Sequence, residues 1–398
     1  MMMSEKSKQH VDSCRFCWMC HHICPIGNAT GQERNTARAR ALGISMVNRG
    51  AIDLSEIMDN VYECCTCGAC VHDCTTGWDP VMFTKETRLL ATLEDKLPSY
   101  ISTLVDNCLD HGSAYGKTAL CDALAEKIAA HSAKTDTLFY LGADARQKAC
   151  KLAHRAIEVL EKAGISFTVL ADEPASGAQL DFLIGKAEET REQMQACADV
   201  MNGYATVVLY DPADAKAVKQ LYGEYGVEVT AKARTYTSFL SSLLEEGKLT
   251  PVKSDKKVVF QDPYQLSRDL GECEEPRTVI RAYADLSEML LFGTETVFAG
   301  SLLMAEYMPD VMNKVASRRL SNVKSIGADT VVTASVSEYV LMKNAAEDVT
   351  VLSLEDIIRR IRRKHICSSI CKPSSGWQRQ AASAFPRSTY IIPRRSWA

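Results

Sequence analysis

Two cysteine runs with the same spacing lie near the start of this chain. In each run, three cysteines are separated by two residues, and a fourth follows after three more. The runs are Cys14, Cys17, Cys20 and Cys24, followed by Cys64, Cys67, Cys70 and Cys74. Three thiolates at this spacing can bind three corners of one [4Fe–4S] cube, whereas the fourth cysteine points toward a second cube. The runs therefore predict two [4Fe–4S] clusters close enough to exchange electrons.

The spacing also predicts which thiolates share a cube. With the usual cross-ligation, each cube takes three cysteines from one run and the outer cysteine of the other. The expected sets are Cys14, Cys17, Cys20 and Cys74 for cluster 1, and Cys64, Cys67, Cys70 and Cys24 for cluster 2. The two loops then depend on each other, because losing an outer cysteine damages the cluster of the opposite loop.

The residues between the cysteines have expected roles of their own. Gly68 suits a tight turn around a cube, whereas the equivalent residue of the first loop is the bulkier Trp18. We expect Trp18 and Phe16 to shield one cube from water instead. We expect Cys65 to be buried without binding metal, since its side chain cannot face the same cube as Cys64. The remaining residues are expected to lie apart from the clusters or beside them without binding: His21, His22, His72, Cys108, Cys121, Cys150, Cys197 and Cys273.

Zinc and disulfides are the alternatives to iron and sulfide. Zinc takes four ligands, usually as two C-x2-C pairs, and the third and fourth cysteines of each run exceed that need. Disulfide scaffolds are typical of short secreted chains, whereas this chain has 398 residues and a polar start without a signal peptide. The pattern favours iron–sulfur clusters.

Composition indicates a globular protein with an acidic body and a basic tail. The chain is 46% hydrophobic and 24% charged, and no apolar run is long enough to span a membrane. Residues 359–398 contain Lys and Arg but no Asp or Glu, although the net charge of the whole chain is −4. The tail lacks the aromatic and basic pattern of a nucleic-acid module, so we expect it to be flexible, and Cys367 and Cys371 within it to bind no metal. The expected location is the cytoplasm, or the inner face of the membrane through a partner.

The periodicity divides the chain into a helical part and an α/β part. Residues 1–95 predict an all-α helical ferredoxin-type lobe, with helices over residues 37–47, 55–61 and 81–93, and residues 96–134 predict a helical connector. Residues 135–250 and 251–358 each predict an α/β repeat with a parallel sheet, and residues 359–398 form the tail. The expected strands are 137–141, 166–170, 205–210, 257–260 and 328–333. The fold class is therefore α+β overall, with a helical lobe followed by a duplicated parallel-sheet domain.

From about Val11 to Asp356 the chain resembles the iron–sulfur subunits related to heterodisulfide reductase, to anaerobic glycerol-3-phosphate dehydrogenase and to glycolate oxidase. The eight cysteines carry the specific part of this resemblance. In that family each repeat adds a Cys-Cys-Gly element and further cysteines to a substrate-side metal or cluster site. The corresponding segments here are Gly142-Ala143, Ala175-Ser176-Gly177, Asp211-Pro212-Ala213-Asp214, Phe298-Ala299-Gly300 and Ala334-Ser335-Val336-Ser337.

These replacements leave the repeats without their soft ligands. Gln261 to Arg268 looks like the family's His-Asp-Pro-Cys-His-Leu-Gly-Arg, and retains Asp262 and Arg268 but no thiol or imidazole. A thiolate-bound metal does not survive replacement of its ligands by Ala, Tyr and Ser, so we expect no third cluster. Asp262 and Arg268 could line a pocket, but an Asp-Pro turn with a nearby Arg is more often structural.

The resulting hypothesis is an electron-transfer subunit without its own bond-making site. Two clusters would relay single electrons between a flavin-containing dehydrogenase or electron-transfer flavoprotein subunit and another redox protein or quinone. A disulfide or thioester reductase subunit whose repeats bind substrate, and a non-catalytic assembly or sensor protein, remain alternatives. Glycine-rich nucleotide fingerprints and hydrolase motifs are absent from the sequence, and nucleic acid is not an expected partner.

Overall fold

The computed structural model describes residues 3–14 and 17–360, with side chains up to residue 358. Phe16, Cys367, Cys371 and the predicted tail beyond residue 360 lie outside the described residues. Helices predominate, and all strand pairs between the named strands are parallel, which confirms the predicted α+β class.

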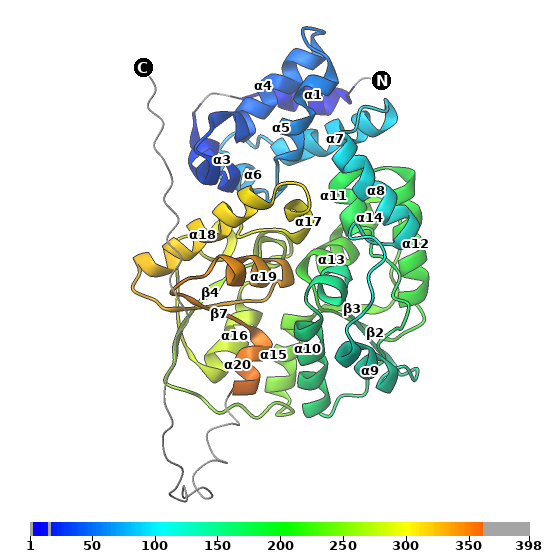
Figure 1. Ribbon diagram of the computed structural model, residues 1–398, viewed down its shortest axis with the longest axis vertical. Coiled ribbons are helices and arrows are strands. Elements are labelled where there is room, and N and C mark those ends of the chain that lie inside the picture. Colours follow the sequence, from blue (N-terminus) through cyan, green and yellow to red (C-terminus); the bar gives the residue numbers. More distant parts are fainter. Residues whose placement is uncertain (1–2, 15–16, 361–398) are drawn as a thin grey trace, which may run out of the picture. The chain divides into compact units, whose positions relative to one another are not determined.

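The N-terminal part consists of helices and turns, drawn in blue to cyan in Figure 1. They are α1 (Glu5–Asp12), α2 (Met19–Ile23), α3 (Pro25–Thr30), η1 (Glu33–Asn35), α4 (Ala37–Asn48), η2 (Leu54–Ile57), α5 (Met58–Tyr62), α6 (Ala69–His72) and α7 (Pro80–Leu93). Two of these elements begin at aspartate caps: Asp53 forms a capping box with Glu56, and Asp79 accepts a hydrogen bond from Met82 N–H. Apolar residues on α4, α5 and α7, among them Ile44, Val61 and Phe83, form one buried cluster. The helices predicted over residues 37–47, 55–61 and 81–93 are confirmed.

Two further helices connect this lobe to the sheets. They are α8 (Ser99–His111) and α9 (Asp122–Ala130), and they lie within residues 96–134, where the sequence predicts a helical connector. Gly112 ends α8 in the left-handed conformation, at φ 69°.

The first sheet has the strand order β1-β2-β3, all parallel. Its strands are β1 (Thr137–Tyr140), β2 (Thr206–Leu209) and β3 (Lys232–Thr235). The helical segments between and after them are η3 (Asp144–Lys148), α10 (Cys150–Lys162), α11 (Ala178–Ile184), α12 (Glu188–Met201), α13 (Pro212–Lys216), η4 (Ala217–Leu221), α14 (Tyr222–Glu224) and α15 (Tyr236–Glu245).

The second sheet is also parallel, in the order β5-β4-β6-β7. Its strands are β4 (Lys257–Gln261), β5 (Asp285–Ser287), β6 (Thr330–Thr333) and β7 (Thr350–Ser353). The helical segments are η5 (Gln265–Asp269), α16 (Glu274–Tyr283), η6 (Gly293–Glu295), α17 (Leu302–Ala305), α18 (Pro309–Ser325), α19 (Val336–Ala345) and α20 (Leu354–Arg360).

The two sheets follow the same sequence of elements. In each, the opening strand leads into a π-helical turn (η3 or η5) and then a longer helix (α10 or α16). The strand that pairs with the opening strand, β2 in the first half and β6 in the second, leads into α13 and α19 respectively. This repetition agrees with the predicted duplication.

The strand predicted over residues 166–170 is wrong as a full strand. It is reduced to an isolated parallel bridge between Leu138 and Thr168, on the side of β1 away from β2. The bridge consists of two hydrogen bonds, from Phe139 N–H to Thr168 O and from Thr168 N–H to Thr137 O, both 2.8 Å. In the second half β5 has the corresponding place beside β4. Strands β3 and β7 were not predicted from the sequence.

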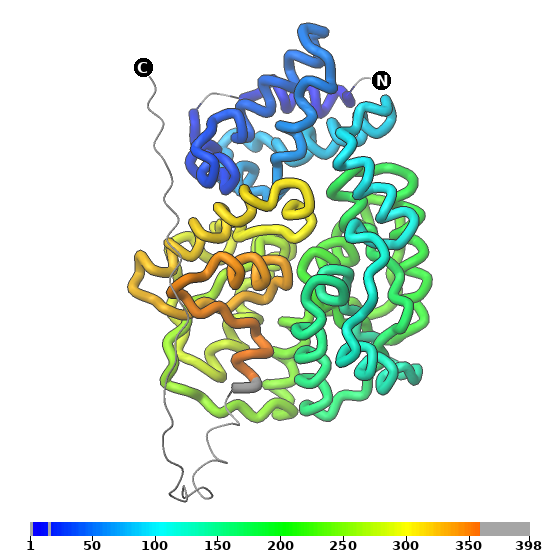
Figure 2. The backbone as a smooth tube through the Cα atoms, viewed as in Figure 1, coloured from blue at the N-terminus to red at the C-terminus, as the bar shows by residue number. Residues whose placement is uncertain are grey.

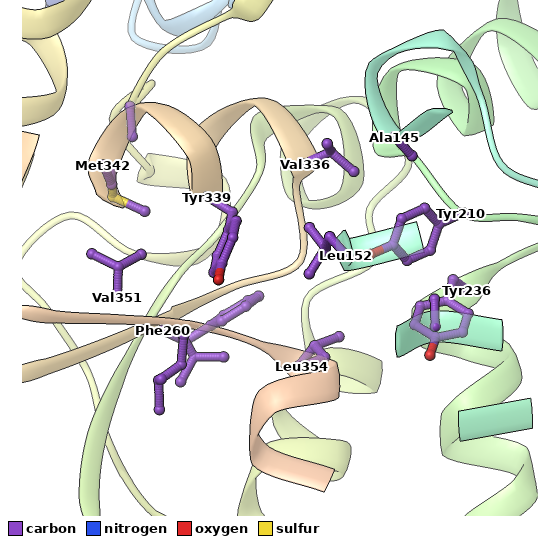
Figure 3. Close-up of a cluster of buried hydrophobic side chains, with 14 of the residues drawn as sticks. Ala145, Leu152, Tyr210, Tyr236, Phe260, Val336, Tyr339, Met342, Val351 and Leu354 are labelled. Atoms are coloured by element: carbon purple, nitrogen blue, oxygen red, sulfur yellow. The ribbon is translucent and has the colours of Figure 1, made fainter. Parts of the chain in front are cut away.

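One buried apolar cluster extends across both sheets. Figure 3 shows Ala145, Leu152, Tyr210 and Tyr236 of the first half facing side chains of the second half, including Phe260, Val336, Tyr339 and Leu354. In Figure 2 the green backbone of the first half and the yellow and orange backbone of the second lie side by side. The two halves therefore share a core, and the predicted domain boundaries stay predictions.

Candidate functional site

The two cysteine loops have the same backbone conformation at equivalent positions. Trp18 immediately precedes α2 with φ 68° and ψ 3°, and Gly68 immediately precedes α6 with φ 71° and ψ 2°. In each loop this left-handed residue lies directly after the second cysteine, and the third cysteine lies on the short helix that follows. The sequence predicts this turn for Gly68 but not for Trp18.

Trp18 adopts a conformation that costs a residue with a Cβ atom about 1 kcal/mol or more. A contact partly offsets that cost, because the Arg38 guanidinium lies 4.2 Å from the centroid of the Trp18 ring. The Trp18 side chain is 43% exposed, so it covers the neighbouring thiols only in part.

The first group of thiols contains the outer cysteine of the second run. Cys14, Cys17, Cys20 and Cys74 border one small cavity between the two loops. Burial raises the pKa of Cys20, and the negative charges of Cys14, Cys17 and Cys74 raise it further. Cys70 borders the same cavity, so the second loop lies directly beside this group.

The second group contains the outer cysteine of the first run. Burial raises the pKa of Cys24 to about 11, and the charges of Cys67 and Cys64 add to that effect. Burial also raises the pKa of Cys70, with contributions from Cys67, Cys64 and Cys24. Cys24 caps the start of α3 by accepting from Gly27 N–H at 3.5 Å, which places its sulfur toward the second loop.

Two arginines lie beside the second group. Arg40 is buried, donates from Nε to Asn60 O at 3.0 Å, and lowers the pKa of Cys24 and Cys70 against the effect of burial. Arg268 donates to the carbonyl oxygens of Cys67 and Thr296. The pKa of Cys67 is lowered to about 7, first by a hydrogen bond with Cys65 and then by the charge of Arg268. Sequence reasoning missed Arg40, whose position depends on the packing of α4 against the loops.

Cys74 has its own set of hydrogen-bond donors. Burial raises its pKa, but the Thr76 hydroxyl and the N–H groups of Thr76, Trp78 and Gly77 outweigh that effect and lower it. The Thr76 hydroxyl lies 3.2 Å from Cys74 Sγ. These donors favour a thiolate at this position, which is the state in which cysteine binds metal.

Other residues singled out from the sequence lie around the two groups. Cys65 is 5% exposed, as expected. His72 Nε2 lies 2.7 Å from Glu295 Oε1, which ties the second loop to η6. Asp262 forms a buried ion pair with Arg277 at 2.7 Å.

Cys121 and Cys150, which show no paired spacing in the sequence, form a disulfide. They are 29 residues apart in sequence, and their Cα atoms are 6.4 Å apart. Cys121 precedes α9 and Cys150 begins α10, two helices that pack against each other, so tertiary packing pairs cysteines that show no spacing signal.

The segments that replace the family's repeat cysteines come together around one pocket of about 170 Å³. Its lining includes Ala143, Ser176, Asp211, Asp214 and Ser337, which come from separate segments of both halves. Cys65 and Thr66 of the second cysteine loop also border it, so the pocket lies next to the second group of thiols. Asp262 and Arg268 are not among its lining residues.

Neither a single-metal site nor a membrane-spanning helix is found in the described residues. Within residues 3–14 and 17–360, no three His, Cys, Asp or Glu side chains are arranged to hold a single metal ion. In the same part of the chain, no helix has both the length and the apolar character needed to cross a bilayer.

Comparison with known proteins relates the chain to iron–sulfur proteins. No family model matches the chain. One subunit of the dihydromethanophenazine:CoB–CoM heterodisulfide reductase of Methanosarcina acetivorans is 26% identical, in an alignment covering 81% of this chain and 86% of that protein. A probable membrane-anchored ferredoxin of Chromohalobacter salexigens is 25% identical over 77% of this chain, but the chain spans only 47% of that protein's length. An uncharacterized iron–sulfur protein of Methanococcus maripaludis is 18% identical over 89% of this chain and 74% of its own length. These relatives confirm the resemblance stated from the sequence.

Proposed function

Since its relatives are iron–sulfur proteins of the heterodisulfide reductase type, we propose that this chain is an electron-transfer subunit with two [4Fe–4S] clusters. Cluster 1 is held by Cys14, Cys17, Cys20 and Cys74, and cluster 2 by Cys64, Cys67, Cys70 and Cys24. The observation that carries the proposal is the grouping of the thiols, because each group contains three cysteines of one run and the outer cysteine of the other.

The donor sets fit such clusters. Each group offers four sulfurs, and soft thiolates are the ligands of iron–sulfur cubes. When bound, a [4Fe–4S] cluster accepts and releases one electron at a time. Arg40 and Arg268 place positive charge beside the second set, which favours the more negative, reduced state there.

The partner in this proposal is a flavin-containing dehydrogenase or an electron-transfer flavoprotein subunit. A two-electron flavin can release its electrons singly, which suits paired one-electron centres. The second partner is another redox protein or a quinone-linked protein, and the chain works in the cytoplasm or at the inner face of the membrane. The heterodisulfide reductase relatives are by their names parts of a multisubunit redox enzyme, which supports a complex here.

A reductase subunit that binds a disulfide or thioester substrate is the second candidate. The pocket beside Cys65 and Thr66 favours it, because a substrate bound there would be next to cluster 2. The pocket wall, however, presents Asp211, Asp214 and Ser176 where a thiolate-bound centre would need cysteines.

Elemental and spectroscopic analysis of the anaerobically purified full chain separates the candidates. The proposal predicts about eight irons per chain and signals of two cubes alone. Iron in clear excess of eight, with the signal of an unusual third cluster, would favour the reductase. Co-purification of the native chain with a flavoprotein in fixed ratio supports the proposed partner, whereas isolation of the chain alone counts against it.

A further inference from the structure

Three carboxyl groups, of which Asp211 and Asp214 are buried and Asp144 is half-buried, stand together at the wall of the pocket between the two halves. Asp144, Asp211 and Asp214 all line it, and Asp211 and Asp214 are 4% and 9% exposed. The charge of Asp144 acts on Asp211, and the charges of Asp211 and Asp144 act on Asp214, so the three groups repel one another when ionised. Burying several like charges is costly unless a cation accompanies them.

The three carboxyl groups accept several hydrogen bonds, but Oδ2 of Asp211 has no donor in bonding geometry among the described residues. Asp144 accepts from the hydroxyls of Tyr115 and Ser337, and Asp214 accepts from the hydroxyl of Ser176. Asp211 Oδ1 accepts from Ala213 N–H at 2.8 Å. Asp211 Oδ2 is buried and, in the part of the chain that the structure describes, meets no hydrogen-bond donor in bonding geometry, although the Val336 N–H lies close enough to lower the pKa of this carboxyl. A buried carboxylate oxygen without a donor is rare in folded proteins and indicates a missing partner.

The cations around the pocket are engaged with other acids. Arg146 lies 3.9 Å from Glu173, Lys216 lies 2.8 Å from Asp269, and Lys148 lies 2.6 Å from Glu306. Among the described residues, none of the three aspartates has a salt bridge. Within the described ranges, no direct ion pair therefore stabilises the ionised forms of these acids, and burial together with their mutual repulsion raises the pKa of Asp211 and of Asp214. A bound cation would favour the ionised forms.

The backbone is shaped around these acids. Gly142 has φ +82°, and a Cβ atom at that position would lie 2.0 Å from Asp214 Oδ2. Only glycine admits both the conformation and the approach of the carboxylate. Tyr140, Tyr264 and Phe298 also line the pocket, and the faces of aromatic rings attract cations.

We propose that this pocket binds a small organic molecule through a protonated amine, held by Asp211 and Asp214 with Asp144 beside them. An ammonium group supplies up to three N–H donors, which matches several carboxylate acceptors including the open Oδ2 of Asp211. A metal ion fits less well, because no three acids in the described residues are arranged to hold one. The pocket volume of about 170 Å³ admits a compact molecule only. This inference goes beyond the proposed electron transfer and does not depend on it.

The test is calorimetric titration of the anaerobically purified full chain with 1,4-diaminobutane. The expected result is saturable binding of one diamine per chain, and no binding of 1,4-butanediol, which has nearly the same size but no charge. Absence of diamine binding at roughly millimolar concentration, or equal binding of the diol, overturns the proposal. This comparison uses the unaltered chain and needs no variant.

Variants then locate the site. Asp211→Asn and Asp214→Asn each should weaken diamine binding by about thirtyfold or more, because each removes one partner of a buried charge pair. Asp199→Asn is the matched control, since Asp199 lies on the exposed side of α12 and should leave binding unchanged. If either pocket variant fails to fold, Ser176→Ala, which removes the hydroxyl that holds Asp214, should weaken binding while Ser317→Ala on α18 should not. Unchanged affinity in the folded pocket variants, or tight binding of Mn²⁺ or Mg²⁺ without diamine binding, contradicts the proposal.

Discussion

Arg268 Nη1 donates a hydrogen bond of 2.5 Å to the carbonyl oxygen of Cys67, which joins the second parallel sheet region to the second cysteine loop. The same guanidinium donates from Nε to Thr294 O at 3.0 Å and from Nη2 to Thr296 O at 2.6 Å. One side chain thus fixes the segment around η6 against the loop. From the sequence, Arg268 could either line a pocket or have a structural role. These contacts favour the structural role.

Replacing Arg268 tests its charge. Arg268→Gln should lower the reduction potential of cluster 2 by roughly tens of millivolts, because a positive charge close to a cluster stabilises its reduced state. Arg268→Lys keeps the charge and should stay close to the unaltered protein. Redox titration followed by electron paramagnetic resonance measures both. A Gln variant with an unchanged or higher potential would show that the charge does not act on the cluster.

Exchanging the outer cysteines tests the ligand sets. Cys74→Ser should reduce the iron content from about eight to about four per chain and remove the signal of the first-loop cluster, because Cys74 lies with Cys14, Cys17 and Cys20. Cys24→Ser should remove the other cluster. Cys273→Ser serves as the control, since Cys273 at the start of α16 belongs to neither run and its Sγ donates to Ser267 O. The ligand sets are wrong if Cys74→Ser loses the second-loop cluster and keeps the first.

The disulfide between Cys121 and Cys150 should stabilise the chain. It closes a segment of 29 residues, and loop-closure entropy predicts a contribution of roughly 3 to 4 kcal/mol. Cys150→Ser should lower the free energy of unfolding by about that amount, measured by anaerobic denaturant titration. Peptide mapping without reductant should recover the linked peptides from the unaltered chain. Recovery of both thiols free in the freshly isolated protein would contradict the pairing.

Stability should fall as pH rises toward 8. Burial raises the pKa of Glu338 to about 8, although Ala299 N–H, Gln261 and Thr333 donate to it. In the unfolded chain the pKa of glutamate is about 4.3, so the folded state holds this proton more tightly, and the free energy of unfolding declines between about pH 4 and pH 8. Glu338→Gln should flatten that decline by a few kcal/mol, whereas exposed Glu347→Gln should not. The free energy of unfolding of both variants is measured at pH 6 and at pH 8.5. If it declines equally between these pH values in both variants, Glu338 is excluded as the cause.

Periodicity and spacing predicted what depends on local sequence. The helix over Ala37–Asn48, the strands that begin at Thr137 and Lys257, and the parallel pairing followed from apolar patterns and turn residues. The division of the eight cysteines into two ligand sets follows from their spacing, which limits which thiols reach one cube, and it stays a prediction. The resemblance also named segments, such as Asp211–Asp214, that the structure brings to one pocket.

What could not be predicted depends on tertiary packing. The left-handed backbone of Trp18 is compensated by Arg38, which is twenty residues away, and burial of Arg40 follows from the position of α4. The pairing of Cys121 with Cys150 depends on two helices meeting at their starts. The strand predicted over residues 166–170 is reduced to one bridge to β1, between Leu138 and Thr168.

Iron and zinc content together with Mössbauer spectroscopy of the full chain, isolated without oxygen, tests the central claim most directly. The account predicts about eight irons per chain in two cubes that dithionite reduces, with negligible zinc. Stoichiometric zinc, or a preparation without a reducible chromophore, would contradict it.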